Sequence, residues 1–265
     1  MIGFLDSGVG GLTILEEVHK VIPEYDTLYL GDTAHAPYGN KTHDELVALV
    51  WNGCTWLFAQ GCELIILACN SASASALREI QQTKLQEYPG KRILGVIRPT
   101  VEELARSGHK RVVVLSTVAT KESGAYPREF KKLGATIEVI THACPQWVPM
   151  IEAGKAASDE MREDVLREIA AFEQEAGEYD AVLLACTHYP YVHRLVEQAL
   201  ARKVPVYNQG ELVARSLADY LKRHPEIESK LGNHRAYRYV TTGDAQLASK
   251  IATDRFGFEV TFSHA

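Results

Sequence analysis

The sequence of 265 residues lacks the features that mark several large classes of protein. No apolar run approaches the ~18 to 20 residues that a membrane-spanning helix needs, which argues against a membrane protein. No block or stripe of basic residues is present, and the net charge of −6 comes from scattered side chains, so nucleic-acid binding has little support. The chain begins directly on a predicted strand without a charged leader, and we expect a cytoplasmic location.

Cysteine is also scarce, with five residues at irregular spacing. An odd number in a chain of this length is typical of reduced thiols in a cytoplasm and argues against a disulfide scaffold. The intervals between Cys54, Cys62 and Cys69 match no zinc pattern, so the sequence predicts no metal site. Cys54 and Cys62 flank a helical pattern and are expected in the core. Cys144, in the stretch HACPQW, has no evident role.

Short apolar runs alternate with helical patterns along the chain. Strands are predicted at residues 1–5, 27–30, 64–68, 93–96, 111–116, 136–141, 181–185, 204–207 and 237–241. This alternation predicts an α/β fold with mostly parallel, doubly wound sheets. We expect one domain from residues 1–95 plus 207–265 and a second from 96–206. Because no low-complexity linker separates them, the two should pack closely.

The stretch LIILACNSASAS, residues 64–75, predicts a buried strand that delivers Cys69 to the start of a helix. Asn70 and Ser71 are good N-cap residues, and SASALREIQQTK reads as the helix. The helix dipole would favour the thiolate and lower the pKa of Cys69 from roughly 8.5 towards neutrality. For a lone strand-end cysteine, a structural role in the core is the alternative.

A second stretch repeats this pattern. Residues 181–190 read AVLLACTHYP, so that Cys186 matches Cys69, and a helical pattern follows. MIGFLDSGVGGLTIL and KRVVVLSTVATKESGAY are likewise both strands that lead through small residues into a helix. The chain is therefore predicted to contain two related halves, each with a cysteine at the strand end where open α/β sheets bind ligands. Thr187 and His188 follow Cys186, and a histidine there could tune the charge of the thiol.

Two further loops place polar residues at predicted strand ends. Asp6 and Ser7 precede GVGG, where the backbone can approach an anionic ligand; an ordinary tight turn is the alternative. The loop lacks the full glycine spacing of a dinucleotide-binding site. The stretch GDTAHAPYGN, residues 31–40, contains Asp32, Tyr38 and Gly39, and alone it would be read as a polar loop.

Seven stretches together resemble the cofactor-independent glutamate racemases of the aspartate/glutamate racemase family: DSGVGG, GDTAHAPYGNKT, ACNSASA, SGAYPREF, ACPQWVPMIEAG, ACTHYP and TTGDAQ. The resemblance runs from residue 2 to about residue 260. It implies two pseudo-symmetric α/β domains with the active site between them. It further implies racemisation of L-glutamate to D-glutamate for peptidoglycan synthesis, by a homodimer that needs neither pyridoxal phosphate nor a metal.

The resemblance also implies roles for individual residues. Cys69 and Cys186 would be the two catalytic bases, with Cys186 on the face that meets L-glutamate. The substrate-binding pairs would be Asp6 with Ser7, Tyr38 with Gly39, Asn70 with Ser71, and Thr187 with His188. The thiols would be supported by Asp6, Asp32, Glu152 and His188, and Thr117 and Thr120 would add contacts from the second half.

The sequence departs from the family pattern at several positions. Serine replaces the usual threonine at Ser71, and the other departures are His35 for arginine, Ala185 for glycine, Asn208 for aspartate and Arg98 for glutamate. The amino-terminal extension of members activated by a cell-wall precursor is absent, so we do not expect that activator.

Inverting an α-carbon requires a proton to leave one face and another to arrive on the opposite face, and two bases from facing half-domains suit this chemistry. Two alternatives remain open. One is a racemase for aspartate or another amino acid; such relatives carry an acidic residue where His188 stands. The other is a non-catalytic amino-acid-binding or thiol-redox protein that uses the cysteine pair.

Overall fold

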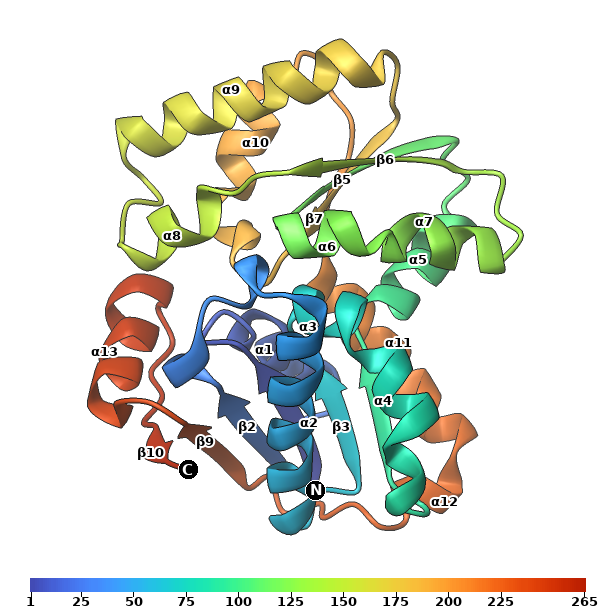
Figure 1. Ribbon diagram of the computed structural model, residues 1–265, viewed down its shortest axis with the longest axis vertical. Coiled ribbons are helices and arrows are strands. Elements are labelled where there is room, and N and C mark those ends of the chain that lie inside the picture. Colours follow the sequence, from blue (N-terminus) through green and yellow to red (C-terminus); the bar gives the residue numbers. More distant parts are fainter.

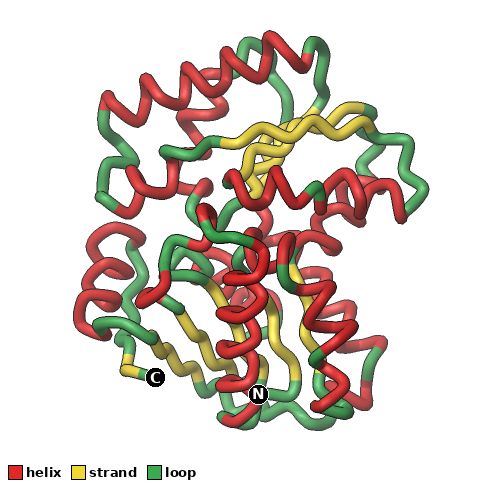
Figure 2. Tube along the Cα trace, in the orientation of Figure 1, coloured by secondary structure: helices red, strands yellow, loops and turns green.

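Ten strands form two separate sheets that are parallel throughout, in a computed structural model that describes residues 1–265 (Figures 1 and 2). The six-stranded sheet contains β1 (Ile2–Asp6), β2 (Thr27–Gly31), β3 (Leu64–Leu67), β4 (Arg92–Gly95), β9 (Tyr237–Thr241) and β10 (Ser263–His264). The four-stranded sheet contains β5 (Arg111–Ser116), β6 (Glu138–Ala143), β7 (Ala181–Ala185) and β8 (Val206–Asn208). All nine predicted strands are present, and β10, which is two residues long, was not predicted.

The two sheets repeat one topology. Their strand orders are β10-β9-β2-β1-β3-β4 and β6-β5-β7-β8. The segment β2-β1-β3-β4 of the larger sheet therefore has the same arrangement as the whole smaller sheet, β6-β5-β7-β8. Cys69 follows β3 and Cys186 follows β7, and these are equivalent strands. The predicted α/β fold with two related halves is therefore confirmed, whereas the domain boundaries at 95/96 and 206/207 stay a prediction.

Helices cover both faces of each sheet (Figure 1). Those of the first half and of the return to it are α1 (Leu12–Val21), α2 (His43–Ala59), α3 (Asn70–Ser75), α4 (Leu77–Thr83), α11 (Gln209–Arg223), α12 (Pro225–Glu228) and α13 (Ala245–Phe256). Those of the second half are α5 (Ile97–Arg106), α6 (Val118–Ser123), α7 (Ala125–Lys132), α8 (Trp147–Glu152), α9 (Asp159–Ala176) and α10 (His193–Ala199). None of these helices is long and apolar enough to cross a membrane.

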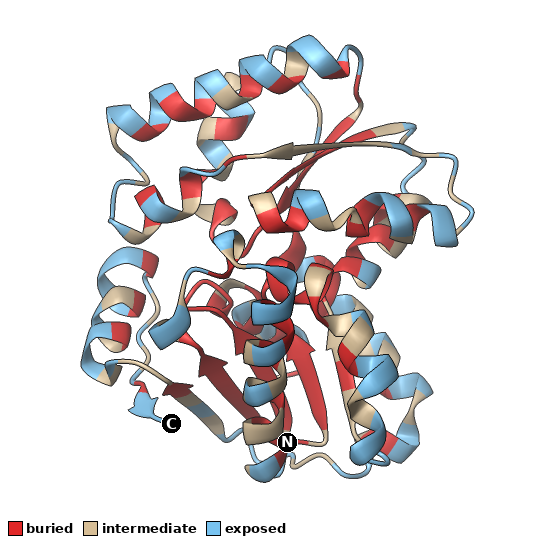
Figure 3. Cartoon of the chain, viewed as in Figure 1, coloured by how far each residue is buried: buried red, intermediate tan, exposed pale blue.

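The helix α9 shows why this sequence forms amphipathic covering helices. Its buried apolar residues recur every three or four positions at Met161, Val165, Ile169 and Phe172. One face of the helix therefore packs on the sheet, and the opposite face is exposed to solvent (Figure 3). Ser158 caps its amino terminus by accepting a hydrogen bond from the Met161 amide, at 3.1 Å.

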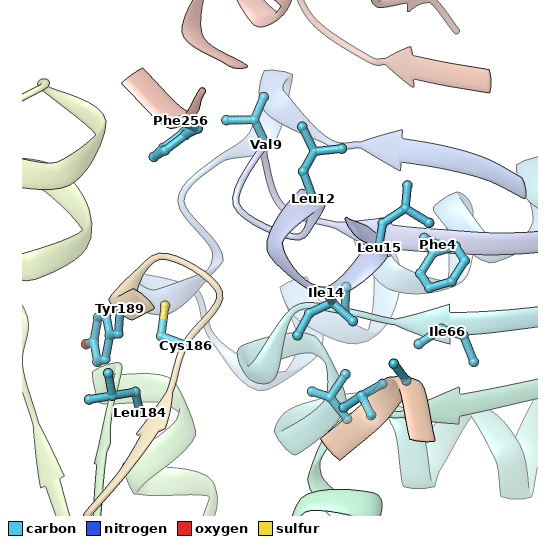
Figure 4. Packing of buried hydrophobic residues seen from close by; sticks show 14 of the residues in the cluster. Phe4, Val9, Leu12, Ile14, Leu15, Ile66, Leu184, Cys186, Tyr189 and Phe256 are labelled. Carbon is cyan, nitrogen blue, oxygen red and sulfur yellow. The ribbon is translucent and has the colours of Figure 1, made fainter. Parts of the chain in front are cut away.

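One hydrophobic cluster of 41 buried residues is shared by the two halves. It includes Phe4 and Leu12 from the first half and Leu184 and Tyr189 from the second (Figure 4). Because burying apolar surface is the main favourable contribution to folding, a shared cluster of this size holds the two sheets together. The prediction of close packing between the halves is confirmed.

The prediction of a single helix capped by Asn70 or Ser71 after Cys69 is wrong. The structure has two helices, α3 and α4, separated at Ala76, and the N-cap of α3 is Cys69 rather than Asn70. Asn70 and Ser71 lie inside the first turn of α3, where their side chains bond to other elements instead of capping the helix.

Candidate active site

The two matching cysteines line one pocket at the carboxyl ends of the strands. The cavity has a volume of about 30 Å³ and is lined by residues from both halves. Each predicted substrate-binding pair contributes to its wall: Ser7, Tyr38, Gly39, Asn70, Ser71, Thr187 and His188. The structure therefore brings together four loops that are far apart in the sequence, at the ends of the strands where open sheets bind ligands.

Cys69 lies at the end of β3 and is 6% exposed. Its Sγ atom is 3.9 Å from the Ser7 hydroxyl oxygen. Burial, together with the nearby charge of Asp6, raises the pKa of Cys69 to about 12, although the Ala72 amide acts in the opposite direction. The predicted fall towards neutrality is therefore wrong: α3 has only six residues, and the cost of burying a thiolate outweighs its dipole. Cys69 rests as a neutral thiol.

Cys186 has a different neighbour. Its Sγ atom lies 4.0 Å from Nδ1 of His188, whose Nε2 lies 3.1 Å from a carboxylate oxygen of Glu152. The second contact is an ion pair rather than a well-aligned hydrogen bond, because Nε2 has no hydrogen-bond partner. Burial alone would lower the pKa of His188, but Cys186 and Glu152 outweigh it and raise the pKa to about 10. A cationic imidazole beside Cys186 attracts negative charge to that sulfur.

Asp6 lies under the turn between β1 and α1. One carboxylate oxygen accepts hydrogen bonds from the amides of Gly8 and Gly11, each 3.1 Å long, and the other oxygen is buried without a partner. Burial raises the pKa of Asp6, whereas His188 and the two amides lower it. The carboxylate does not line the pocket, so it acts on the site through the loop that it holds and through its field.

The glycine at position 10 allows this turn to meet the second half. A β-carbon built on Gly10 would lie 2.6 Å from Cε1 of His188 and 2.8 Å from Oγ1 of Thr187. No side chain fits there unless His188 moves. The neighbouring Thr13 hydroxyl also donates to the Thr187 carbonyl, at 3.1 Å, so α1 is joined directly to the loop that follows Cys186.

Asp32 is buried behind Tyr38 and does not line the pocket. Its carboxylate accepts hydrogen bonds from Tyr38, at 2.6 Å, and from Thr242, at 2.6 Å. It also contacts Nδ1 of His35, at 2.8 Å. Asp32 thus orients Tyr38, which does line the pocket, and Thr242 links the carboxyl-terminal TTGDAQ stretch to Asp32. A direct catalytic role for Asp32, as for Glu152, stays a prediction.

A closed ring of hydrogen bonds beside Cys69 contains two residues that the sequence did not single out. The Asn70 amide donates to Gln209 Oε1 at 2.5 Å, Gln209 donates to the Tyr126 hydroxyl at 2.9 Å, and Tyr126 donates to Asn70 Oδ1 at 2.8 Å. Gln209 also donates to Thr100, at 3.1 Å. All four side chains are buried. The ring fixes the residue after Cys69 against α5, α7 and α11.

A second link between the halves passes through hydroxyl groups. The Ser71 hydroxyl is 2.9 Å from that of Thr117, which caps α6 and donates to Thr120 at 3.1 Å. Ser71 and Thr117 line the pocket, and Thr120 lies behind them. The serine at position 71 therefore retains the hydroxyl contact that a threonine would make.

Cys144 is a third cysteine at the same pocket. It follows β6, the strand equivalent to β2, and is 1% exposed. Its carbonyl accepts a hydrogen bond from Tyr189 at 3.1 Å, only three residues after Cys186. Cys54 and Cys62 are buried in the first half, as predicted, and all five cysteines are free.

Two cysteines at equivalent strand ends of two parallel sheets, on a single narrow pocket, define an α/β protein suited to acid–base chemistry on both faces of one small substrate. The chain belongs to the Asp/Glu/hydantoin racemase family, whose sequence profile matches residues 12–217.

Individual relatives agree over the full length. The chain is 38% identical to a glutamate racemase from Ruegeria pomeroyi, over 100% of this chain and 99% of the relative. The crystal structure of a glutamate racemase isoform from Bacillus anthracis superposes with a TM-score of 0.89 at 27% identity, covering 100% of this chain and 97% of the other. A glutamate racemase from Francisella tularensis, in complex with D-glutamate, gives a TM-score of 0.85 at 26% identity, with 99% and 95% covered.

Proposed function

We propose that this protein is a glutamate racemase that interconverts L- and D-glutamate by proton transfer between two cysteines. The observation that carries the proposal is the placement of Cys69 and Cys186 at equivalent strand ends of two sheets, on one pocket. Full-length relatives that are 37–39% identical bear this name, which supports glutamate over other amino acids.

The two cysteines have complementary surroundings for this reaction. With L-glutamate bound, Cys186 as the thiolate accepts the α-proton, and Cys69 as the thiol donates its proton to the opposite face of the α-carbon. In the reverse direction the two cysteines exchange these roles. Cys69 rests as a neutral thiol, ready to donate, whereas Cys186 lies beside the charged His188. The thiol and thiolate states exchange with each turnover, so a reverse reaction or a proton exchange with water must follow.

The α-carbanion is stabilised electrostatically by its surroundings. The α-proton of an amino acid is very weakly acidic, so the developing charge requires fixed donors in a site that excludes water. The start of α3 at Asn70 and Ser71, and the turn at Thr187 and His188, present polar groups to the pocket from opposite halves. We assign these two segments to the binding of the carboxylates and the ammonium group of the substrate.

The pocket is narrow in this structure. A volume of about 30 Å³ holds one or two water molecules. We infer that the two halves move apart to admit the substrate, since the links Thr13–Thr187 and Ser71–Thr117 join them at the pocket. Closure around the substrate then excludes water from the reacting carbon.

We further propose that the enzyme works in the cytoplasm as a homodimer and supplies D-glutamate for peptidoglycan synthesis, using neither pyridoxal phosphate nor a metal for catalysis. These proposals follow from family membership and from the presence of two bases, which suffice for the proton transfers. Sedimentation of the purified protein at several concentrations measures the oligomeric state.

The activity test is a circular-dichroism time course with D- and L-glutamate, and with both enantiomers of aspartate in parallel. The protein is first dialysed exhaustively against chelator and hydroxylamine. We expect the ellipticity of both glutamate solutions to converge on zero without added cofactor, and we expect no comparable change for aspartate. Faster turnover of aspartate would identify the enzyme as a racemase of different specificity. A reversible Cys69–Cys186 disulfide without turnover of either amino acid would identify a thiol-redox protein.

A further inference from the structure

Three potential metal ligands converge beside the pocket, outside the catalytic pair. His142 lies on β6, Cys144 follows that strand on the same side, and Glu168 reaches them from α9. Their ligand atoms all lie within 4.8 Å of one another, and His142 Nε2 is 2.7 Å from Glu168 Oε2. We propose that His142, Cys144 and Glu168 form a binding site for a divalent transition-metal ion, with Zn²⁺ as the natural occupant.

The set of donor atoms selects this class of ion. One sulfur, one imidazole nitrogen and one carboxylate oxygen, with a fourth position left for water, form a tetrahedral zinc site with an open position. Hard cations such as Mg²⁺ and Ca²⁺ prefer oxygen ligands only. The thiolate and the carboxylate together neutralise the charge of the ion, which suits a position where the histidine and glutamate side chains are 14% exposed and Cys144 is 1% exposed.

The surroundings hold the ligands in place. The His142 ring packs against Phe172, with ring centroids 6.0 Å apart, and Arg167 lies 3.6 Å from the second carboxylate oxygen of Glu168. Groups of this kind orient metal ligands. Zinc bonds of about 2.0 to 2.3 Å separate neighbouring ligand atoms by roughly 3.3 to 3.7 Å in a tetrahedron, so His142 and Glu168 would move apart by less than about 1 Å.

Binding needs no redox partner. Burial and the nearby Glu168 raise the pKa of the Cys144 thiol well above its usual range, so the free protein holds a neutral thiol there. The ion forms a bond to sulfur, nitrogen and oxygen, and Cys144 loses one proton to solvent as the metal–sulfur bond forms. No group changes its oxidation state.

The site is connected to the active centre, and this part of the inference rests on the proposed function. Cys144 lines the substrate pocket, and its carbonyl holds the Tyr189 hydroxyl at 3.1 Å. A dication there would attract negative charge on Cys186 and disfavour the return of a proton to it. We therefore expect Zn²⁺ to lower kcat for racemisation.

The test uses Co²⁺ as a spectroscopic probe and Zn²⁺ as its competitor, with the full-length metal-free protein. We expect one equivalent of Co²⁺ to give tetrahedral d–d absorption and a thiolate-to-cobalt charge-transfer band, both abolished by stoichiometric Zn²⁺. Cys144→Ser should remove the charge-transfer band. His142→Gln and Glu168→Gln should each weaken Co²⁺ binding at least tenfold, while metal-free racemisation is retained. Cys54→Ser, at a buried cysteine far from the site, is the matched control and should change neither band.

The outcomes separate this proposal from the alternatives. Loss of the charge-transfer band in Cys69→Ser or Cys186→Ser, but not in Cys144→Ser, would overturn it, because the metal would then be bound by the catalytic pair. Unchanged Co²⁺ affinity in both His142→Gln and Glu168→Gln would overturn it as well. Comparable thermal denaturation of the metal-free variants confirms that they are folded. Because Co²⁺ absorption does not depend on turnover, a protein that binds cobalt as described but fails to racemise glutamate would contradict the proposed function alone.

Discussion

His188 and Glu152 form an ion pair at the boundary of the active site, with 3.1 Å between Nε2 and the carboxylate oxygen. The imidazole is almost fully buried, whereas the glutamate side chain is one-third exposed. Solvent can therefore weaken the pair from one side only. The pair keeps His188 charged beside Cys186 at neutral pH, with a pKa of about 10.

Glu152→Gln should shift the alkaline limb of the pH–rate profile to lower pH. Without the carboxylate, burial lowers the pKa of His188 with less opposition, so the imidazolium beside Cys186 is lost earlier as the pH rises. We expect the saturated rate from L-glutamate at pH 9 to fall about tenfold more than that at pH 7. The measurement is a pH–rate profile of kcat. Glu163→Gln, at an exposed position of α9, is the control; an identical profile for both variants would contradict the role of Glu152.

The same ion pair predicts how stability depends on pH. The pKa of His188 is raised from 6.5 in the unfolded chain to about 10 in the folded protein. Its contribution to the free energy of unfolding is therefore fully present below about pH 6.5 and is lost as the pH rises towards 10. Denaturant unfolding at several pH values should show this decline in the wild type and a smaller one in Glu152→Gln. Equal slopes for the two proteins would show that the pair does not set the charge of His188.

Gly10→Ala should damage catalysis by steric displacement of His188. The added methyl carbon would lie 2.6 Å from the imidazole, and misplacing a catalytic group by about 1 Å can cost about 100-fold in rate. Gly8→Ala is a matched control in the same turn, since its methyl carbon meets only Glu152 Oε1, at 3.7 Å. The measurement is kcat/KM in both directions. Similar values for the two variants would show that His188 adapts without cost.

The strands and the two cysteines could be predicted because their signals are local. A run such as Leu64–Leu67 predicts a buried strand by composition alone, and the repeat at 181–186 gives the equivalence of Cys69 and Cys186. The chemical state of a side chain depends on burial depth instead. For this reason the sequence predicted a lowered pKa for Cys69, whereas the structure shows a raised one.

Residues that act across long sequence separations gave no local signal. Gln209 is 139 positions from Asn70 and 83 from Tyr126. A glutamine in the first turn of a helix is common, so its position alone did not single it out. The resemblance brought Glu152 to attention, yet its contact with His188 depends on how α8 packs. Neither helix pattern nor spacing could indicate that the side chains of Asn70 and Gln209 would bond to each other.

Gln209→Leu should destabilise the fold more than an ordinary polar substitution. Leucine leaves the buried Asn70 amide group without its acceptor. It also removes the donor to the hydroxyl groups of Tyr126 and Thr100, which keep only their bonds to Asn70 and to the Val96 carbonyl. Each buried group left unsatisfied costs about 1–3 kcal/mol, so we expect the free energy of unfolding to fall by about 3 kcal/mol. Equilibrium denaturation measures the change. Gln82→Leu, at an exposed position of α4, should change stability by less than about 0.5 kcal/mol. A similar small effect at Gln209 would show that the ring contributes no stability.

The assignment of two bases makes a distinctive prediction about isotope uptake. If Cys69 and Cys186 act on opposite faces, each removes a proton from one enantiomer and donates to the other. In heavy water, the product should then carry deuterium at the α-carbon, whereas substrate recovered early should remain largely protiated. A single base working on both faces would return label to substrate and product alike. Proton NMR of the α-position, starting from each enantiomer in turn, distinguishes the two cases.

Single-cysteine variants extend the same experiment. Cys69→Ser and Cys186→Ser should each abolish racemisation, because a serine hydroxyl is far too weakly acidic to replace the thiol. Each variant retains one base, so slow α-proton exchange should persist for one enantiomer only: D-glutamate through Cys69 in Cys186→Ser, and L-glutamate through Cys186 in Cys69→Ser. Cys62→Ser, at a buried cysteine away from the pocket, should racemise normally. Early deuterium in recovered wild-type substrate, or a catalytic variant that still racemises well, would reject the assignment of one cysteine to each face.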